Sequence, residues 1–248
     1  SIDQPICDRR GDLICADWGY AYLASTNGSG KSVSLGDYYG MKESFVKNGT
    51  LATTKTKWTT RKEEDNPAMA YVHNLGSVSN SGKEGFMMLG YDDIYSIEYM
   101  YEKRMGYWKH DGKVTIFDAF EKLRDNYQAI MERCRAFDEL IYDDAEKAGG
   151  KKYAEICSAS YRQVISAHKL FTDKEGNLLW FSKENNSNGC VNTVDLTYPS
   201  APLFLVYNPE LQKAMMTSIF EYSASGRWNK PFPAHDLGTY PIRSEERR

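Results

Sequence analysis

The chain has 248 residues, of which 31 are basic and 34 are acidic, giving a formal net charge of -3. Because no long block of Lys and Arg occurs, the charge pattern disfavours nucleic acid as a partner. No uninterrupted apolar run approaches the roughly 20 residues that cross a bilayer, which argues against a membrane partner. The length allows one large domain or two modest ones.

Cysteine and glycine patterns disfavour several kinds of cofactor site. The cysteines form neither a CxxC pair nor a short-spaced cluster with His, which argues against structural zinc; they are Cys7, Cys15, Cys134, Cys157 and Cys190. No GxGxxG or GxxxxGK[ST] loop is present to hold a dinucleotide or a nucleoside triphosphate. We therefore expect no cofactor and assign no metal ligand.

Extended structure is predicted for the first part of the chain. Over 14–22, apolar and aromatic residues share one parity, as in a strand with one packed face. A segment rich in Thr and Val at 44–57 and short apolar runs at 69–78 and 85–101 are further strand candidates. The sequence therefore predicts a β-rich domain over residues 1–112.

Helices are predicted after the turn sequence His110-Asp111-Gly112. Apolar residues recur at helical spacing over 117–141, which predicts one long helix. Gly149-Gly150 ends that helix, and a second apolar face follows from Tyr153 to His168. The two helices are predicted to form a hairpin.

A second helical hairpin is predicted after a short β-hairpin at 171–181. Its first helix covers 198–207, where prolines are tolerated in the first turn. Asn208-Pro209 is a strong start signal for the next helix, and Gly226 is placed to end it. The helical domain is therefore predicted over 113–248.

Polar residues gather in two loops beside these last helices. In the first loop, Glu184 and Asp195 could form a general acid/base pair, because hydrolysis of a glycosidic bond or an amide needs one group to move a proton and another to activate water. Alternatively, Glu184 is solvated and Asp195 caps a helix that begins near Leu196. Asn188, before Gly189, either binds substrate or adopts a left-handed turn.

The second loop contains His235 beside Asp236, and Trp228 precedes them. An imidazole next to a carboxylate suits proton transfer or the orientation of a polar substrate. Adjacent side chains on an extended loop point apart, however. Structural hydrogen bonds are therefore an equally supported interpretation of this pair.

Several sequence blocks resemble the glutaminase A family. They are DWGYAYLA at 17–24, LGYDDIYSIEYM at 89–100, YWKHDG at 107–112, TIFDAFEK at 115–122, SYRQVISAHKL at 160–170, FSKENNSNGCVNTVDLTYPSAPLFLVYNPEL from 181 and FPAHDLGTYP from 232. The resemblance implies an α+β multidomain fold, with a β-sandwich portion at 1–112 followed by part of an (α/α) six-hairpin toroid at 113–248. It also implies a secreted or periplasmic protein that hydrolyses L-glutamine to L-glutamate and ammonia.

This resemblance gives hypothetical roles to the polar loop residues. The catalytic acid/base groups would be Asp195, Glu184 and Asp236. The substrate-binding residues would be Asn188, Tyr198, Trp228 and His235. No metal is assigned to this site.

Family members continue beyond the HDLGTYP block with further helices. We therefore expect a complementary polypeptide to complete the toroid, and a small molecule, glutamine or a saccharide, to be the substrate. Two alternative functions remain: a carbohydrate-active hydrolase of the six-hairpin glycosidase type, and a noncatalytic fragment that binds a sugar or a partner chain.

Overall fold

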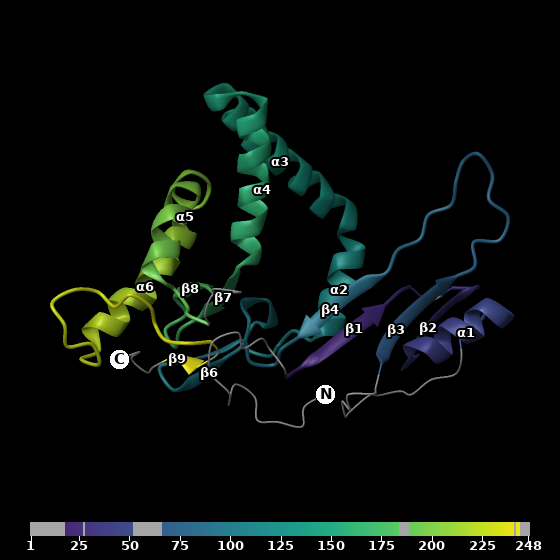
Figure 1. Cartoon of the computed structure of the whole chain (residues 1–248), viewed down its shortest axis with the longest axis horizontal. Helices are drawn as coiled ribbons and strands as arrows, with labels where there is room; N and C mark the ends of the chain where they lie inside the picture. Colours follow the sequence, from purple (N-terminus) through teal and green to yellow (C-terminus); the bar gives the residue numbers. More distant parts are fainter. Residues whose placement is uncertain (1–17, 27, 52–65, 184–188, 241, 244–248) are drawn as a thin grey trace. The chain divides into compact units, whose positions relative to one another are not determined.

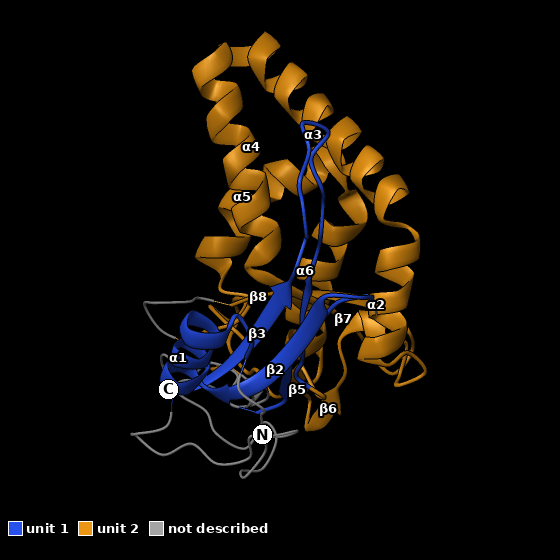
Figure 2. Ribbon diagram, turned by 90° about the vertical axis from the view of Figure 1, so that its right-hand side faces the viewer, with its two compact units in different colours: residues 1–6, 18–93 blue, residues 7–17, 94–248 orange. Residues whose placement is uncertain are grey.

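A computed structural model describes residues 18–26, 28–51, 66–183, 189–240 and 242–243. The described residues fall into two compact units, 18–93 (unit 1) and 94–243 (unit 2), which Figure 2 colours separately. Helices and small sheets are both present, which confirms a mixed α+β fold. The β-sandwich, the toroid and the domain boundary after residue 112 stay predictions.

Unit 1 contains two antiparallel strand pairs. β1 (Tyr20–Ala24) pairs with β4 (Met88–Asp92), and β2 (Lys31–Asp37) pairs with β3 (Pro67–His73). Each of these strands except β2 overlaps a segment predicted to be extended. The alternating pattern therefore located three of the four strands of this unit.

A helix in unit 1 contradicts part of the strand predicted at 44–57. Residues 44–48 lie in α1 (Tyr38–Asn48), while 52–65 lie outside the described residues. Asp37 caps the helix by accepting a hydrogen bond from the backbone N-H of Gly40 at 2.8 Å. Gly49, with a φ of 66°, ends it in the left-handed conformation. These two end signals outweigh the weak strand preference between them.

Unit 2 begins with a small three-stranded sheet. β5 (Ile97–Tyr99) pairs antiparallel with β6 (Glu102–Arg104) and parallel with β9 (Ile242–Arg243). A short 3-10 helix, η1 (Tyr107–Lys109), follows the sheet, whose strands β6 and β9 are labelled in Figure 1. The turn predicted at 110–112 is confirmed, since all three of its residues have positive φ.

The single long helix predicted after this turn is wrong in one respect. Two helices occur, α2 (Ile116–Asp125) and α3 (Tyr127–Gly149), and Asn126 separates them. The backbone of Asn126 has φ -111° and ψ 13°, and its Nδ2 donates a hydrogen bond to the Lys122 carbonyl at 2.8 Å. The side chain and the backbone N-H of Asn126 therefore share the Lys122 carbonyl as acceptor, and α2 ends at this residue.

The first predicted helical hairpin is confirmed. Gly150 has a φ of 80°, and α4 (Lys151–Ser166) returns beside α3 after this turn. The ring of Phe137 on α3 lies 5.2 Å from that of Tyr161 on α4, in an edge-to-face contact. Aromatic packing therefore joins the two helices.

The predicted β-hairpin is also confirmed. β7 (His168–Thr172) pairs antiparallel with β8 (Leu178–Ser182). His168 starts this hairpin rather than ending α4, and its Nδ1 lies 2.5 Å from the Val164 carbonyl oxygen. Its ring stacks on Trp180 at 4.9 Å between centroids, and burial lowers the pKa of the imidazole. His168 is therefore a core residue.

The second helical hairpin packs against β8. α5 (Val194–Tyr207) begins before the predicted start at 198, and α6 (Pro209–Ala224) begins where Asn208-Pro209 predicts. The Asn208 side chain accepts a hydrogen bond from the backbone of α6, as expected for an N-cap. A buried cluster holds the hairpin to the sheet; it consists of Trp180, Phe204, Ala214 and Met215.

Candidate functional site

The two predicted polar loops lie side by side. Val191 of the first loop forms an antiparallel bridge with Lys183, which follows β8. Cys190 forms a second antiparallel bridge with Thr239 of the second loop. The backbone N-H of Leu237 also donates to the Val191 carbonyl at 3.0 Å. The first loop therefore runs between the end of β8 and the second loop.

The start of α5 brings one predicted residue from each loop together. The backbone N-H of Val194, the first residue of α5, donates to the His235 carbonyl at 2.8 Å. Asp195 follows in the first helical turn, and its Oδ1 lies 3.6 Å from Nε2 of His235. A carboxylate is favourable at a helix N-terminus, where the helix dipole is positive.

Asp236 lies next to the other ring nitrogen of the same imidazole. Its Oδ2 lies 3.0 Å from Nδ1 of His235, and its Oδ1 accepts a hydrogen bond from the backbone N-H of Gly238 at 2.7 Å. The expectation that His235 and Asp236 point apart is wrong. The bond from Gly238, whose φ is 98°, folds the chain into an Asx turn that returns the carboxylate toward the ring.

The exposure of these three side chains differs. Asp195 and His235 are 69 % and 66 % exposed, whereas Asp236 is 8 % exposed. Ion pairs this exposed contribute little to folding stability. A proton on Nδ1 would be donated to Asp236 and would leave Nε2 facing Asp195. The arrangement is suited to exchanging protons with a bound small molecule.

The remaining described candidates lie near these elements but do not join the network. Tyr198 is on α5, one turn beyond Asp195, and is 80 % exposed. Trp228 follows α6; its Nε1 donates to the Phe232 carbonyl, and its ring packs against Phe232 at 5.9 Å. Within the described part of the chain, no hydrogen bond or ion pair links Trp228 to the imidazole. Their substrate-binding roles stay predictions.

Two predicted residues, Glu184 and Asn188, lie outside the described residues. Their roles as acid/base group and substrate-binding group therefore stay predictions. The alternative that Asp195 caps a helix near Leu196 is wrong, because Thr193 occupies the N-cap position and Asp195 lies inside the helix.

Sequence reasoning missed Asn192, which is fully buried and has a φ of 50°. Asn is one of the few residues other than Gly that accepts a positive φ cheaply, and an Asn shortly before a helix is the available signal. Asn188 offered the same signal beside a Gly, so the turn was predicted there instead.

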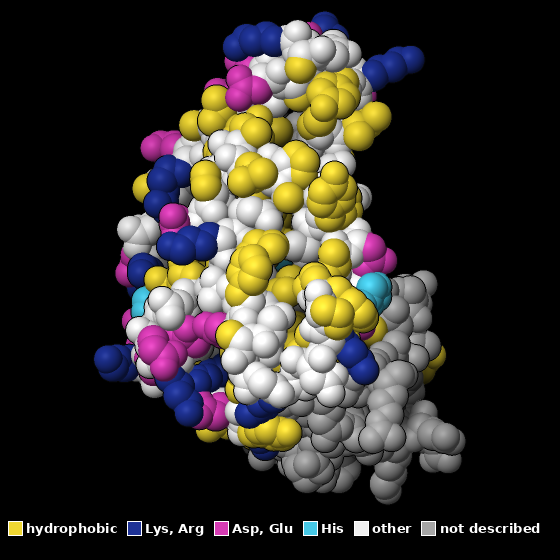
Figure 3. All heavy atoms as spheres, turned by 90° about the vertical axis from the view of Figure 1, so that its left-hand side faces the viewer, with side chains coloured by type: hydrophobic (Ala, Val, Ile, Leu, Met, Phe, Trp, Pro, Cys, Tyr) yellow, Lys and Arg dark blue, Asp and Glu magenta, His cyan; other side chains and the backbone are white. Residues whose placement is uncertain are grey.

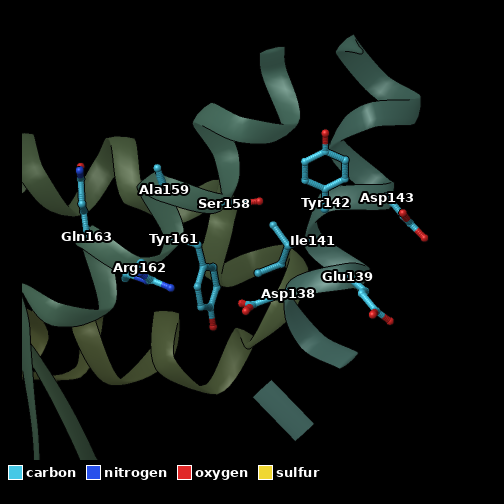
Figure 4. Close-up of a pocket in the computed structure, with 10 residues that line it drawn as sticks. All are labelled: Asp138, Glu139, Ile141, Tyr142, Asp143, Ser158, Ala159, Tyr161, Arg162 and Gln163. Carbon is cyan, nitrogen blue, oxygen red and sulfur yellow. The ribbon is translucent and has the colours of Figure 1, made fainter. Parts of the chain in front are cut away.

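A cavity of about 690 Å³ lies elsewhere, between α3 and α4. Figure 4 shows its lining side chains on the two facing helices, including Asp138, Tyr142 and Arg162. The Oγ of Ser158 in this lining is buried, with no hydrogen-bond partner among the described residues. None of the predicted site residues lines this cavity, so the volume and the candidate chemistry lie in different places.

A partly buried carboxyl group, Glu221, joins α6 to β5 through a tyrosine hydroxyl. The hydroxyl of Tyr99 donates to Oε2 of Glu221 at 2.6 Å, and burial raises the pKa of Tyr99 well above its usual range. Burial raises the pKa of Glu221; the hydrogen bond from Tyr99 lowers it, but the nearby Asp173 carboxylate adds to the rise, so the net direction is upward. This cluster links α6 to the sheets of unit 2.

Metal ligation and membrane insertion find no support within the described ranges. No group of three or more His, Cys, Asp or Glu side chains is placed there to hold a metal ion. The helices of these ranges also lack the length and apolar character needed to span a bilayer. Figure 3 faces the side of α5 and α6 and shows apolar side chains interspersed with charged ones.

Comparisons with known proteins cover both parts of the chain. A glutaminase A six helical-hairpin domain matches residues 150–247, and a domain of unknown function, DUF5127, matches residues 2–144. Glutaminase A of Aspergillus oryzae is 32 % identical over 91 % of this chain and 33 % of its own length. A probable glutaminase of Arthroderma benhamiae is 34 % identical over 39 % of this chain and 11 % of its own length.

The chain therefore spans about a third of the Aspergillus relative and a smaller share of the other. No solved structure matches it. Since both relatives are glutaminases by name and the six-hairpin model matches the region that holds the candidate site, the chain belongs to the glutaminase A family.

Proposed function

We propose that this chain carries part of the active site of a hydrolase that releases ammonia from L-glutamine. One observation carries the proposal: Nε2 of His235 lies 3.6 Å from Asp195 while Asp236 holds Nδ1 at 3.0 Å. A base, a proton carrier and an orienting group are what amide hydrolysis requires of side chains. Membership of the glutaminase A family supports glutamine as the amide.

The proposed reaction moves one proton from water to the leaving nitrogen. Asp195 takes a proton from water as the water oxygen attacks the side-chain amide carbon of glutamine. That proton passes to Nε2 of His235, which gives it to the amide nitrogen as the C-N bond breaks. Ammonia and glutamate are then formed, and both side chains return to their starting protonation states.

Asp236 has a different role in this scheme from the acid/base role expected from the sequence. Both of its oxygens accept hydrogen bonds, one from Gly238 and one from His235. A carboxylate engaged in this way orients the imidazole rather than exchanging protons with substrate. We therefore assign Asp236 as a positioning residue and Asp195 as the base.

We further propose that α5 and α6 form part of the wall of a six-hairpin toroid. Support comes from α5, which is apolar around most of its circumference although Tyr198, Leu205 and Val206 are 80 %, 59 % and 69 % exposed. A helix that is apolar on all sides is typical of a buried position. Further helical hairpins of a complementary polypeptide segment would cover these side chains.

A substrate panel tests the proposed activity. The purified chain, assembled with the complementary segment proposed above, is incubated with L-glutamine, L-asparagine and a set of oligosaccharides, and both ammonia and reducing sugar are measured. We expect ammonia from glutamine, lost in Asp195→Asn with the circular dichroism spectrum unchanged. Release of reducing sugar without ammonia would instead favour the glycosidase alternative. Binding without any turnover would favour the noncatalytic one.

A further inference from the structure

We propose that Asn192 is the positioning residue that sets the distance between Asp195 and His235. The effect on turnover rests on the function proposed above, but the effect on geometry does not. The proposal comes from a buried amide that joins three elements immediately before α5. None of its bonding partners is itself part of the Asp195-His235 pair.

The side chain of Asn192 uses both ends of its amide. Its Oδ1 accepts a hydrogen bond from the backbone N-H of Ser182 at 2.9 Å. Its Nδ2 donates to Oγ of Ser218 at 2.8 Å and to the Met215 carbonyl at 3.3 Å. The residue has no exposed surface, so these bonds form away from water. One side chain thereby ties the loop to the end of β8 and to α6.

The backbone of Asn192 is held as firmly as its side chain. Its N-H donates to the Ser182 carbonyl at 3.1 Å, so Asn192 and Ser182 exchange two hydrogen bonds, one through the side chain. Its φ of 50° lies in the left-handed region, where the chain turns away from β8 toward the N-cap Thr193. Asn adopts this conformation at a lower cost than other residues with a β-carbon.

Both members of the candidate pair depend on this anchored turn. Asp195 follows it in the first turn of α5, and His235 is attached to the same segment through its carbonyl, which accepts from Val194 at 2.8 Å. The pair itself is exposed and its atoms are 3.6 Å apart, so it lacks the packing to fix its own geometry. We therefore infer that the buried hydrogen bonds of Asn192 hold Asp195 and His235 in place. Functional side chains generally need such supporting residues to keep their geometry.

A matched set of variants separates the effect of the Asn192 side-chain hydrogen bonds from the effect of its backbone conformation. Asn192→Gly keeps the positive φ but removes all three side-chain hydrogen bonds. Ser218→Ala removes one of them at nearly constant volume. Ile141→Ala, in the buried face of α3, serves as a control that destabilises unit 2 without touching the loop. Each variant is prepared both with and without the additional substitution Asp195→Asn.

The first readout is geometric and needs no turnover. The ring ¹⁵N chemical shifts of His235 are recorded with and without Asp195→Asn, and their difference reports how closely the two side chains interact. We expect this difference to shrink several-fold in Asn192→Gly, to shrink partly in Ser218→Ala and to stay unchanged in Ile141→Ala. An unchanged difference in Asn192→Gly would overturn the proposal, whatever the activity.

The second readout is kinetic. We expect kcat for glutamine to fall on the order of 10- to 100-fold in Asn192→Gly with KM little changed, because a misplacement of about 1 Å is that costly. A loss confined to stability, equal to that of Ile141→Ala, would contradict the positioning role. If Asn192→Gly does not fold, Ser218→Ala decides: a shift difference equal to that of the unaltered chain rejects the proposal. Absence of ammonia release from the unaltered chain assembled with its complementary segment would count against the proposed function alone.

Discussion

The two helical hairpins of unit 2 differ in how their polar side chains are held. The α3-α4 hairpin has a cavity and several acidic side chains, and its helices contact one another through apolar and aromatic side chains, including Phe137 with Tyr161. The α5-α6 hairpin is joined to the preceding loop by the buried hydrogen bonds of Asn192, and in the following loop Asp236 bonds to Gly238 and His235. The two hairpins therefore offer different features: a cavity in one, and in the other a buried polar group that supports exposed ones, which is the arrangement on which the proposed site rests.

The largest predicted difference between the two hairpins is in the turnover of variants made near each of them. Replacing the imidazole in His235→Gln should lower kcat for glutamine by about 10²- to 10⁴-fold, because proton transfer through Nε2 is lost. In contrast, Asp138→Asn in the α3-α4 cavity should leave kcat unchanged. Ammonia release under substrate saturation measures both. Equal losses in the two variants would break the distinction between the hairpins.

A second prediction concerns stability. Phe204 of α5 has no exposed surface, so Phe204→Ala should lower the free energy of unfolding by about 3–5 kcal/mol. Phe137 of α3 is partly exposed, so Phe137→Ala should lower the free energy of unfolding by less than Phe204→Ala does. Urea denaturation followed by circular dichroism compares them. A larger loss in Phe137→Ala would show that the α3-α4 hairpin, not the α5-α6 hairpin, holds the principal core.

A smaller effect is expected when the orienting carboxylate is changed. Asp236→Asn should lower kcat about 10- to 100-fold, because the amide no longer selects the Nδ1-H tautomer of His235. Glu139→Gln, at the α3-α4 cavity, is the matched control. The kinetic comparison requires both proteins to show the same thermal midpoint as the unaltered chain. A fully active Asp236→Asn would remove the orienting role.

The smallest effect is a change in how stability depends on pH. In the unfolded chain Glu221 titrates at its ordinary value of 4.5, and burial beside Asp173 raises the pKa in the folded state. The folded state therefore keeps the proton where the unfolded state has released it, so this group's stabilisation is lost as pH rises through the folded pKa.

Glu221→Gln, which does not titrate, should show a smaller fall in the urea midpoint between about pH 4 and about pH 7. The Gln can still accept the hydrogen bond from Tyr99, so packing is preserved. Glu139→Gln, an exposed change on α3, is the control. Identical pH profiles for Glu221→Gln and the unaltered chain would show that Glu221 does not titrate with a raised pKa in the folded state.

Local signals predicted much of the helical half of the fold. The Asn208-Pro209 start of α6 and the turn at Gly150 act within a few residues, so the sequence alone reveals them. The break at Asn126 was not predicted, because apolar residues continue at helical spacing through it. The start of α5 was predicted too late, because Pro199 and Pro202 suggested a helix that begins just before them. In unit 1, α1 was missed because its end caps were overlooked.

The candidate site was predictable in composition but not in geometry. The motifs named Asp195, His235 and Asp236, and the structure brings these three together. The Asx turn at Gly238 and the bond from Asn192 to Ser218, 26 residues away in sequence, arise from the folded chain. Spacing alone carries no information about such contacts.

The tautomer of His235 tests the central claim most directly. A long-range ¹H-¹⁵N correlation spectrum assigns the proton of the neutral ring to Nδ1 or Nε2. The account predicts the Nδ1-H form, because Asp236 accepts that proton at 3.0 Å and leaves Nε2 facing Asp195. A ring that is predominantly Nε2-H, or one whose tautomer is unaltered in Asp236→Asn, would contradict it.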